Sequence, residues 1–255
     1  MQFRDKRVVI TGAGGIFGGW IAEAFAAEGA RLLLSDNRPE AVDALVSRLG
    51  PNAAPVLRHR TELTDAASIE DLAAFTAREW GAPDFVVNNA GIYPRSGPLL
   101  ELDVADWDRL MDVNFRAPFI LTREMAKLMI REKVEGSIVN IGSGAARKMN
   151  LGSVPYCTSK TALERLSKGL ALELAQHRIR VNVVEPGFAP GSDVSLLPPG
   201  YAEDMIARIP LNRASGPGDA PRAVLYLCSE AASFITGAVL SVDGGNSIGT
   251  YQRPK

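Results

Sequence analysis

The stretch that decides the fold is VVITGAGGIFGG, residues Val8–Gly19, in which an apolar run passes through clustered glycines into a helical pattern. Val, Ile and Thr favour a strand, and glycines permit the tight turn and close backbone approach of a strand-to-helix junction. A helix that begins directly after such a turn presents free N–H groups and a positive dipole end to a phosphate. The stretch therefore predicts the pyrophosphate-binding turn of a dinucleotide site.

An acidic residue stands where such a site needs one. Asp36 ends the next apolar run, eighteen residues after Gly18, close to the roughly twenty expected for a carboxylate on the adenosine ribose hydroxyls. The same carboxylate would repel a 2′-phosphate, so the sequence favours NAD over NADP. Arg38 leaves NADP open, because a cation there could reach a phosphate, although a solvated residue at a helix start is the simpler interpretation.

Short β-rich runs alternate with amphipathic helical patterns along the chain. The expected strands are Arg7–Thr11, Arg31–Ser35, Ala54–Arg58, Phe85–Asn88, Ser137–Ile141, Arg180–Val184 and Val239–Val242. The expected helices are Ile16–Glu28, Glu40–Leu49, Ala66–Trp80, Trp107–Glu132, Tyr156–Gln176 and Asp219–Cys228. This alternation implies right-handed crossovers and a parallel sheet covered by helices on both faces. We predict one α/β domain over residues 1–255, a Rossmann-type doubly wound parallel sheet.

Bulk properties narrow the class of protein. The 255 residues are 46% hydrophobic and 22% charged, with a formal net charge of −1 and no block of Lys or Arg, which argues against nucleic acid or an anionic membrane as the main partner. Two cysteines and two histidines without a cluster make a metal site improbable on chemical grounds. With no signal-peptide pattern and no run of eighteen apolar residues, we expect a cytoplasmic protein.

One segment, residues 188–210, interrupts the strand–helix alternation with four prolines and two glycines. It contains a possible short helix at Tyr201–Arg208 and begins just past the carboxyl end of a strand, where open α/β sheets bind ligands. Long loops in compact domains are usually functional, so a substrate lid is favoured over a passive surface connection, which stays open.

The chemistry is concentrated in Tyr156-Cys157-Thr158-Ser159-Lys160, thirteen residues after Ser143. A Tyr and a Lys four residues apart lie on one face of a helix, and a cation beside a phenol favours the phenolate. A phenol with a lowered pKa can take a proton from an alcohol or return one to a carbonyl.

At this point the chain resembles the short-chain dehydrogenase/reductase family, in its single-domain branch, from about Lys6 to Gly245. The matching motifs are the glycine turn, Asn88-Asn89-Ala90-Gly91, Asn114, Ser143, the Tyr156/Lys160 pair, Pro186-Gly187, Ile235-Thr236-Gly237 and Val242-Asp243-Gly244-Gly245. Two departures stand out. The glycine spacing is T-G-x-x-G-x-x-G rather than T-G-x-x-x-G-x-G, and Gly191 occupies a position where the family often has a threonine that bonds the nicotinamide amide.

The resemblance implies an NAD-dependent oxidoreductase that transfers a hydride between the cofactor and a secondary alcohol or ketone. Its catalytic residues would be Asn114, which holds a water of a proton relay, Ser143, which binds the substrate oxygen, Tyr156 as acid–base, and Lys160, which lowers the tyrosine pKa and bonds the nicotinamide ribose. The expected cofactor-binding residues are Gly12, Gly15, Phe17, Gly18, Asp36, Glu62, Leu63, Asn89, Ala90, Gly91, Tyr156, Lys160, Pro186, Gly187 and Ala189.

The small-molecule substrate stays open. Arg95, Arg147 and Lys148 follow motif residues and would bind a carboxylate, sulfonate, phosphate or polyhydroxylated substrate beside Ser143, or else are solubilising charges. A sugar or polyol is slightly favoured. The first alternative is a 3-oxoacyl-[acyl-carrier-protein] reductase, which Asp36 and Leu172 disfavour, because those reductases mostly use NADPH and tend to carry a basic carrier-docking residue at the latter position. The alternative of another class is a non-catalytic NAD-binding regulator.

A homotetramer is expected. The predicted helix Tyr156–Gln176 is apolar on more than one side, and a second apolar face needs a second partner. Leu121, Met125, Leu128 and Met129 give the preceding helix the same character, and the family resemblance favours two-fold helix pairing.

Overall fold

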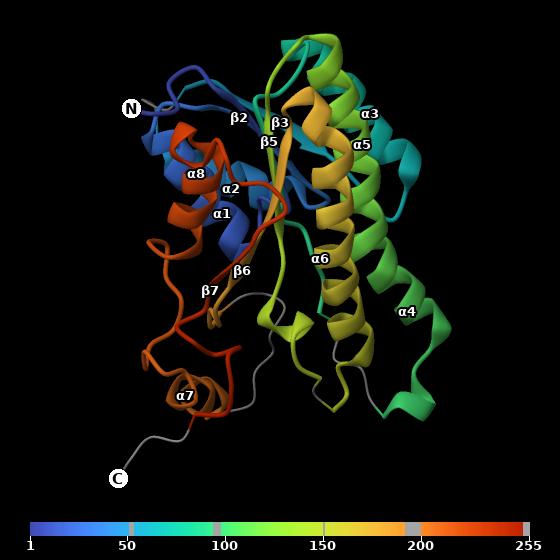
Figure 1. Ribbon diagram of the computed structural model, residues 1–255, viewed down its shortest axis with the longest axis vertical. Coiled ribbons are helices and arrows are strands. Elements are labelled where there is room, and N and C mark those ends of the chain that lie inside the picture. Colours follow the sequence, from blue (N-terminus) through green and yellow to red (C-terminus); the bar gives the residue numbers. More distant parts are fainter. Residues whose placement is uncertain (51–53, 94–97, 150, 192–199, 252–255) are drawn as a thin grey trace.

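Seven parallel strands form one sheet, as the sequence predicts. The computed structural model describes residues 1–50, 54–93, 98–149, 151–191 and 200–251. The strands are β1 Arg7–Thr11, β2 Arg31–Asp36, β3 Val56–Arg60, β4 Phe85–Asn88, β5 Ser137–Ile141, β6 Arg180–Pro186 and β7 Val239–Val242. Their order is β3-β2-β1-β4-β5-β6-β7 (Figure 1). The strand order reverses between β1 and β4, and in such sheets ligands bind there, outside the carboxyl ends of the strands.

Helices cover both faces of the sheet. The helices are α1 Ile16–Ala27, α2 Pro39–Leu49, α3 Ala66–Trp80, α4 Val104–Met111, α5 Ala117–Arg131, α6 Val154–Leu174, α7 Tyr201–Ala207 and α8 Ala220–Cys228. Figure 1 shows α1, α2 and α8 on one side and α3, α5 and α6 on the other. Successive residues of β1 point to opposite faces, so Val8 and Ile10 enter one core and Val9 enters the other. Burial on both faces explains why these strands are almost continuously apolar.

The expected helix Trp107–Glu132 is in fact three consecutive pieces. Helix α4 begins earlier, at Val104, because the Asp103 carboxylate accepts a hydrogen bond of 2.9 Å from the Ala105 N–H. A π-helical turn, Asp112–Arg116, then separates α4 from α5. Pro118 has no N–H to donate to a carbonyl four residues back, which weakens regular α-helical bonding at this point. The strand expected at Ala54–Arg58 is shifted to Val56–Arg60, where Val56 and Leu57 pair with Leu32 and Leu33 of β2.

The prediction that α5 presents a second apolar face to a partner is wrong. Its four residues are buried in the core of the same chain, with exposed fractions of 1% for Leu121, 0% for Met125, 9% for Leu128 and 0% for Met129. They pack against the sheet and against α3. The buried face of α5 is therefore wider than the sequence pattern indicated. On α6, by contrast, Leu172 is 81% exposed.

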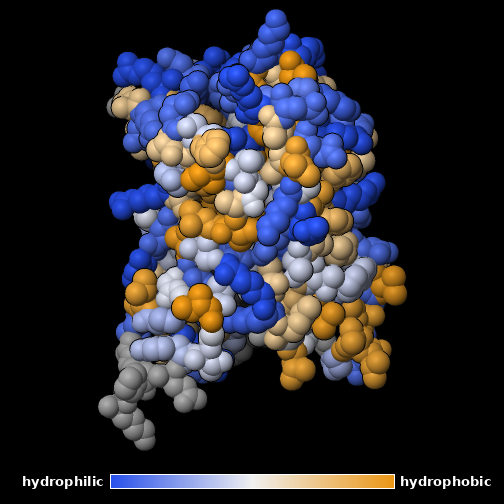
Figure 2. All heavy atoms as spheres, in the orientation of Figure 1, coloured by the Kyte–Doolittle hydropathy of each residue, from blue (hydrophilic) through white to orange (hydrophobic). Residues whose placement is uncertain are grey.

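The surface has an apolar end. Figure 2 shows apolar side chains gathered over the end of the molecule that carries α4, where Leu99, Leu100 and Val104 are exposed. Within the described residues, no helix has the length and apolar character that spanning a bilayer requires. The cytoplasmic location expected from the sequence stays a prediction.

Candidate active site

The glycine turn after β1 is built for close backbone approach. Gly12 has a φ of +63°, and a Cβ there would lie 2.6 Å from the Ala90 Cα. A Cβ on Gly18 would lie 2.2 Å from the Gly12 carbonyl oxygen. The Asn89 side-chain amide donates to the Thr11 and Gly12 carbonyls at 2.9 and 3.0 Å. The turn and the segment after β4 thus hold one another in place, and α1 begins at Ile16 with its N-terminus at the cleft.

Asp36 lies at one end of this cleft. It is 7% exposed, and its Oδ2 accepts a hydrogen bond of 3.0 Å from the Gly14 N–H. Its Oδ1 accepts from the Arg38 N–H at 3.0 Å and from Arg38 Nε at 3.4 Å. The alternative that Arg38 extends toward a phosphate is therefore not the conformation in the structure. Its guanidinium is paired with the carboxylate that the phosphate would have to displace.

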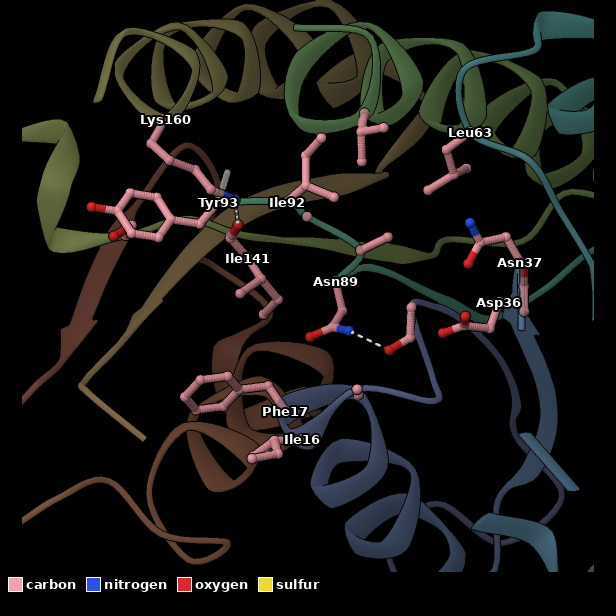
Figure 3. A pocket seen from close by; sticks show the side chains of 18 of the residues that line it. Ile16, Phe17, Asp36, Asn37, Leu63, Asn89, Ile92, Tyr93, Ile141 and Lys160 are labelled. Carbon is pink, nitrogen blue, oxygen red and sulfur yellow. Dashed lines mark hydrogen bonds between the residues drawn. The ribbon is translucent and has the colours of Figure 1, made fainter. Parts of the chain in front are cut away.

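The cleft, about 600 Å³ in volume, extends from Asp36 to Tyr156 and Lys160. In Figure 3, Asp36 and Asn37 lie at one end and Lys160 and Tyr93 at the other, with Asn89 between them. All but one of the expected cofactor residues line it; Ala189 is buried just beyond Gly187 and does not. Asn37, Ile92, Asp106, Arg109 and Val113 also line it and were not predicted, because only the fold brings α4 and the turn after β2 to the cleft.

The Tyr156/Lys160 pair has electrostatics opposite to those expected from the sequence. Lys160 is only 4% exposed, and its Nζ donates to the Ile141 carbonyl at 2.9 Å and lies 5.8 Å from the centre of the Tyr156 ring. Burial lowers the pKa of Lys160 to about 8. Burial also raises the pKa of Tyr156, against the hydrogen bond with Ser143, which lowers it. The expectation that Lys160 lowers the tyrosine pKa is therefore not met in this structure, because desolvation dominates at both groups.

Asn114 sits in the π-helical turn and is fully buried. Its side chain donates to the Ile92 carbonyl at 2.9 Å and accepts from the Ile92 N–H at 2.8 Å. A Cβ at Gly91 would lie 3.4 Å from both Asn114 Oδ1 and Lys160 Nζ, so this glycine keeps the space between them open. The structure thus brings Asn114 next to Lys160, and its role in holding a relay water stays a prediction.

Comparisons with known proteins agree with this geometry. A family model described as enoyl-(acyl carrier protein) reductase matches residues 12–247. The chain is 34% identical to a 3-oxoacyl-[acyl-carrier-protein] reductase of Thermotoga maritima over 96% of this chain and 99% of that one. It is 35% identical to a cis-4-hydroxycyclohexanecarboxylate dehydrogenase of Sinomonas cyclohexanicum over 95% and 97%. A short-chain type dehydrogenase/reductase from Mycobacterium marinum superimposes with a TM-score of 0.89 at 29% identity, with 97% of each chain covered.

The chain belongs to the short-chain dehydrogenase/reductase family. It is an oxidoreductase that acts on CH–OH or keto groups with a nicotinamide cofactor. The residues present fit such a cofactor. At Gly12 and Gly18 there is no room for a side chain, so only backbone faces the cleft there. The buried Asp36 carboxylate lies at the end of the cleft where the adenosine ribose would bind. The chain departs from the common glycine spacing of the family at Ile16, where that spacing has a glycine, and Gly15 stands one residue earlier, with room for a Cβ in contact with the Gly12 oxygen at 3.4 Å.

The substrate end of this family member differs from the sequence prediction. Arg147 does not line the cleft; its guanidinium contacts the Glu185 carboxylate and the Ser241 hydroxyl. The Lys148 ammonium donates to the Asn246 carbonyl at 3.2 Å. Arg95 lies outside the described residues, as do residues 192–199 of the segment expected to act as a lid, whose short helix α7 is described.

Tyr93 is the aromatic group closest to the chemistry. Its ring meets the Tyr156 ring edge-on, with centres 4.5 Å apart, and its hydroxyl lies 2.8 Å from the hydroxyl of Ser153. Ser153 is buried and precedes α6. The Tyr93 ring therefore forms a wall beside Tyr156, and its position two residues after the Asn-Asn-Ala-Gly segment was the signal for it in the sequence.

Proposed function

We propose that the protein transfers a hydride between NAD and a secondary alcohol or its ketone, and that it uses NAD in preference to NADP. The preference rests on Asp36. Its carboxylate is almost fully buried, is bonded to the Gly14 N–H and lines the cleft. It can accept hydrogen bonds from the two ribose hydroxyls, whereas a 2′-phosphate would bring a second negative charge against it.

Ser143 and Tyr156 have different roles at the reacting carbon. NAD, when bound, supplies the hydride acceptor, and the reduced form supplies the donor. In the oxidative direction the Ser143 hydroxyl orients the substrate oxygen and the Tyr156 phenolate takes the hydroxyl proton, while the hydride leaves the carbon. In the reductive direction the Tyr156 phenol donates its proton to the oxygen that develops negative charge. The raised pKa of Tyr156 favours the phenol form, which suits reduction at neutral pH.

For the substrate, we favour a neutral alcohol over an anionic one. Two of the three cations expected to bind an anion are instead bonded to groups of the chain itself, Arg147 to Glu185 and Lys148 to Asn246. A sugar or polyol, the slightly favoured reading of the sequence, is consistent with this. An alicyclic alcohol is a further candidate, because Tyr93 and Val113 line the cleft and the Sinomonas relative is named for a ring substrate.

The alternative, a 3-oxoacyl-[acyl-carrier-protein] reductase, is favoured by the name of the Thermotoga relative. Against it, Leu172 presents an uncharged, 81% exposed side chain where a carrier-docking cation is expected. A non-catalytic regulator would leave the hydrogen-bonded Ser143 and Tyr156 pair without a purpose.

A substrate panel tests these proposals. Polyols, aldoses, cis-4-hydroxycyclohexanecarboxylate and cyclohexanol are offered with NAD and NADP, and a 3-oxoacyl thioester with NADH and NADPH, at 340 nm. We expect turnover of an alcohol with kcat/KM higher for NAD than for NADP, and a smaller ratio in Asp36→Ala. Fastest turnover of the thioester with NADPH would select the alternative, and no turnover by any pair would select the regulator.

We also propose a homotetramer. The buried apolar residues of α5 do not support assembly, because they pack within the same chain. The support is now Leu172 on α6, the partly exposed Phe119 and Ile130 of α5, and Phe234, which is fully exposed before β7. Light scattering at micromolar concentration tests it, since a mass near that of the 27.3 kDa chain would reject assembly.

A further inference from the structure

An ion pair between a buried carboxylate, Glu185, and a partly exposed guanidinium, Arg147, lies beside the active site. Glu185 is the sixth residue of β6 and is 0% exposed, although it carries a carboxylate. Its Oε2 contacts the Arg147 guanidinium and accepts a hydrogen bond of 2.7 Å from the Ser241 hydroxyl of β7. Arg147 also contacts Ser241, so the three side chains touch one another. A carboxylate removed from water at this depth is costly unless it is paired in this way.

The pair fixes both ends of the segment that carries Ser143. At its start, a Cβ on Gly142 would lie 2.7 Å from Val183 Cγ1 and 3.2 Å from Glu185 Cγ, so the backbone before Ser143 rests on the stem of Glu185. At its end, Arg147 follows the 3-10 turn Gly144–Ala146 and reaches back to the same carboxylate. The short stretch between these two points holds the hydroxyl that bonds Tyr156.

Glu185 also precedes the turn on which the nicotinamide is expected. Pro186 and Gly187 follow it and line the cleft, and the Gly187 N–H donates to the Val242 carbonyl of β7 at 2.9 Å. Figure 1 shows β7 beside β6 at this edge of the sheet. One carboxylate thus joins the serine segment, the Pro-Gly turn and β7, the three pieces of backbone that surround the reacting atoms.

We propose that Glu185 and Arg147 are positioning residues, which hold Ser143 at its working distance from Tyr156 and from the nicotinamide turn. The proposal rests on the hydride-transfer function argued above. Because a displacement of about 1 Å at reacting groups can cost about 100-fold in rate, loss of the pair should act on kcat. It should leave cofactor binding nearly unchanged, since the adenosine end is held by Asp36 and the glycine turn.

The charge of Glu185 gives the proposal a distinctive signature. In Arg147→Met the carboxylate loses its guanidinium partner, and its second oxygen, Oε1, already has no hydrogen-bond partner among the described residues. A carboxylate left in that place is tolerated best when protonated. Activity of the variant, relative to the wild type at the same pH, should therefore rise as the pH falls. The other charged group that faces Arg147 is Glu164 of α6, which itself faces Lys168, and Asp243 adjoins Gly144.

The experiment compares wild type, Arg147→Met, Glu185→Gln, the double variant and two controls, with the fastest substrate of the panel. Arg48→Met removes an exposed ion pair with Glu23 and controls for loss of a surface cation; Glu164→Gln controls for the neighbouring carboxyl. Both are expected to match the wild type. Arg147→Met should lose at least about 10-fold in kcat, with the NADH dissociation constant, measured by fluorescence, within about 2-fold. The loss should shrink between pH 8 and pH 6, and the double variant should show no such pH dependence.

The outcomes separate the two proposals. Absence of turnover by the wild type across the panel contradicts the proposed function. A wild type that turns over, with Arg147→Met near wild-type kcat or with a pH-independent deficit, overturns the positioning role. If Arg147→Met does not fold, Arg147→Lys replaces it: the retained charge should recover kcat to within a few-fold and remove the pH dependence, and a pH-dependent deficit in that variant contradicts the proposal.

Discussion

The charged Lys160 side chain should lower the free energy of unfolding of the protein. Lys160 is 4% exposed, and within the described part of the chain its ammonium has one hydrogen bond, to the Ile141 carbonyl at 2.9 Å. The fall of its pKa from 10.5 to about 8 means that the charged form is held at a cost of about 3 kcal/mol relative to the unfolded chain. Replacing it by methionine, which is flexible and of similar length, removes that cost and gives up a hydrogen bond worth about 1 kcal/mol. Lys160→Met should therefore be more stable at pH 7 by about 2 kcal/mol, while losing NADH affinity and turnover.

The pH dependence identifies the cause. Below pH 8 the lysine is charged in both the folded and the unfolded chain, so the full cost is present. As the pH rises from 8 toward 10.5 the folded protein loses this proton first, and the cost disappears. Melting temperatures of the two proteins should differ by about 4–8 °C at pH 7 and converge near pH 10. Lys127→Met, at an exposed position of α5, serves as the control and should show neither effect. A lower melting temperature for Lys160→Met at pH 7, or a difference that does not change with pH, would refute the reasoning.

Three further outcomes are expected. Tyr156→Phe should lower kcat by at least about 10²-fold with NADH affinity within a few-fold, because only the proton-transfer hydroxyl is lost; near-wild-type kcat would exclude the mechanism. Gly18→Ala should abolish NADH binding measured by fluorescence, since its Cβ would lie 2.2 Å from the Gly12 oxygen, whereas Gly169→Ala on α6, with nothing within 4 Å, should bind normally and be slightly more stable. Asp84→Asn should cost about 1.5–3 kcal/mol in urea unfolding, because Asp84 accepts from the Arg7 N–H and Nε at 2.9 and 2.7 Å. Despite its burial, these bonds hold the pKa of Asp84 below its usual value, so its contribution is present above pH 4 and should be lost as the pH falls further.

Local signals were enough to predict the framework. The glycine turn, the apolar strands and the position of Asp36 each depend on a few neighbouring residues, and the structure places them as expected. What local signals did not predict was the interruption between α4 and α5, which follows from Pro118 and from the bonds between Asn114 and a loop twenty-two residues away. The pKa shift of Tyr156 was predicted with the wrong direction, because spacing on a helix shows that Tyr156 and Lys160 are close and does not show how much water each has lost.

Arg147 shows where a better sequence argument was available. It was interpreted as a substrate-binding cation or else a solubilising charge, because it follows Ser143, but the sequence also contains Glu185 in VNVVEPG, a carboxylate inside a largely apolar, buried strand. Such a carboxylate requires a cationic partner. One source of such a partner is the segment that leaves the carboxyl end of a neighbouring strand, and β5, the neighbour of β6, is followed within six residues by Arg147. A charge in a buried strand is therefore evidence that a residue distant in the sequence packs against it, and Arg147 is a candidate for that partner on these grounds.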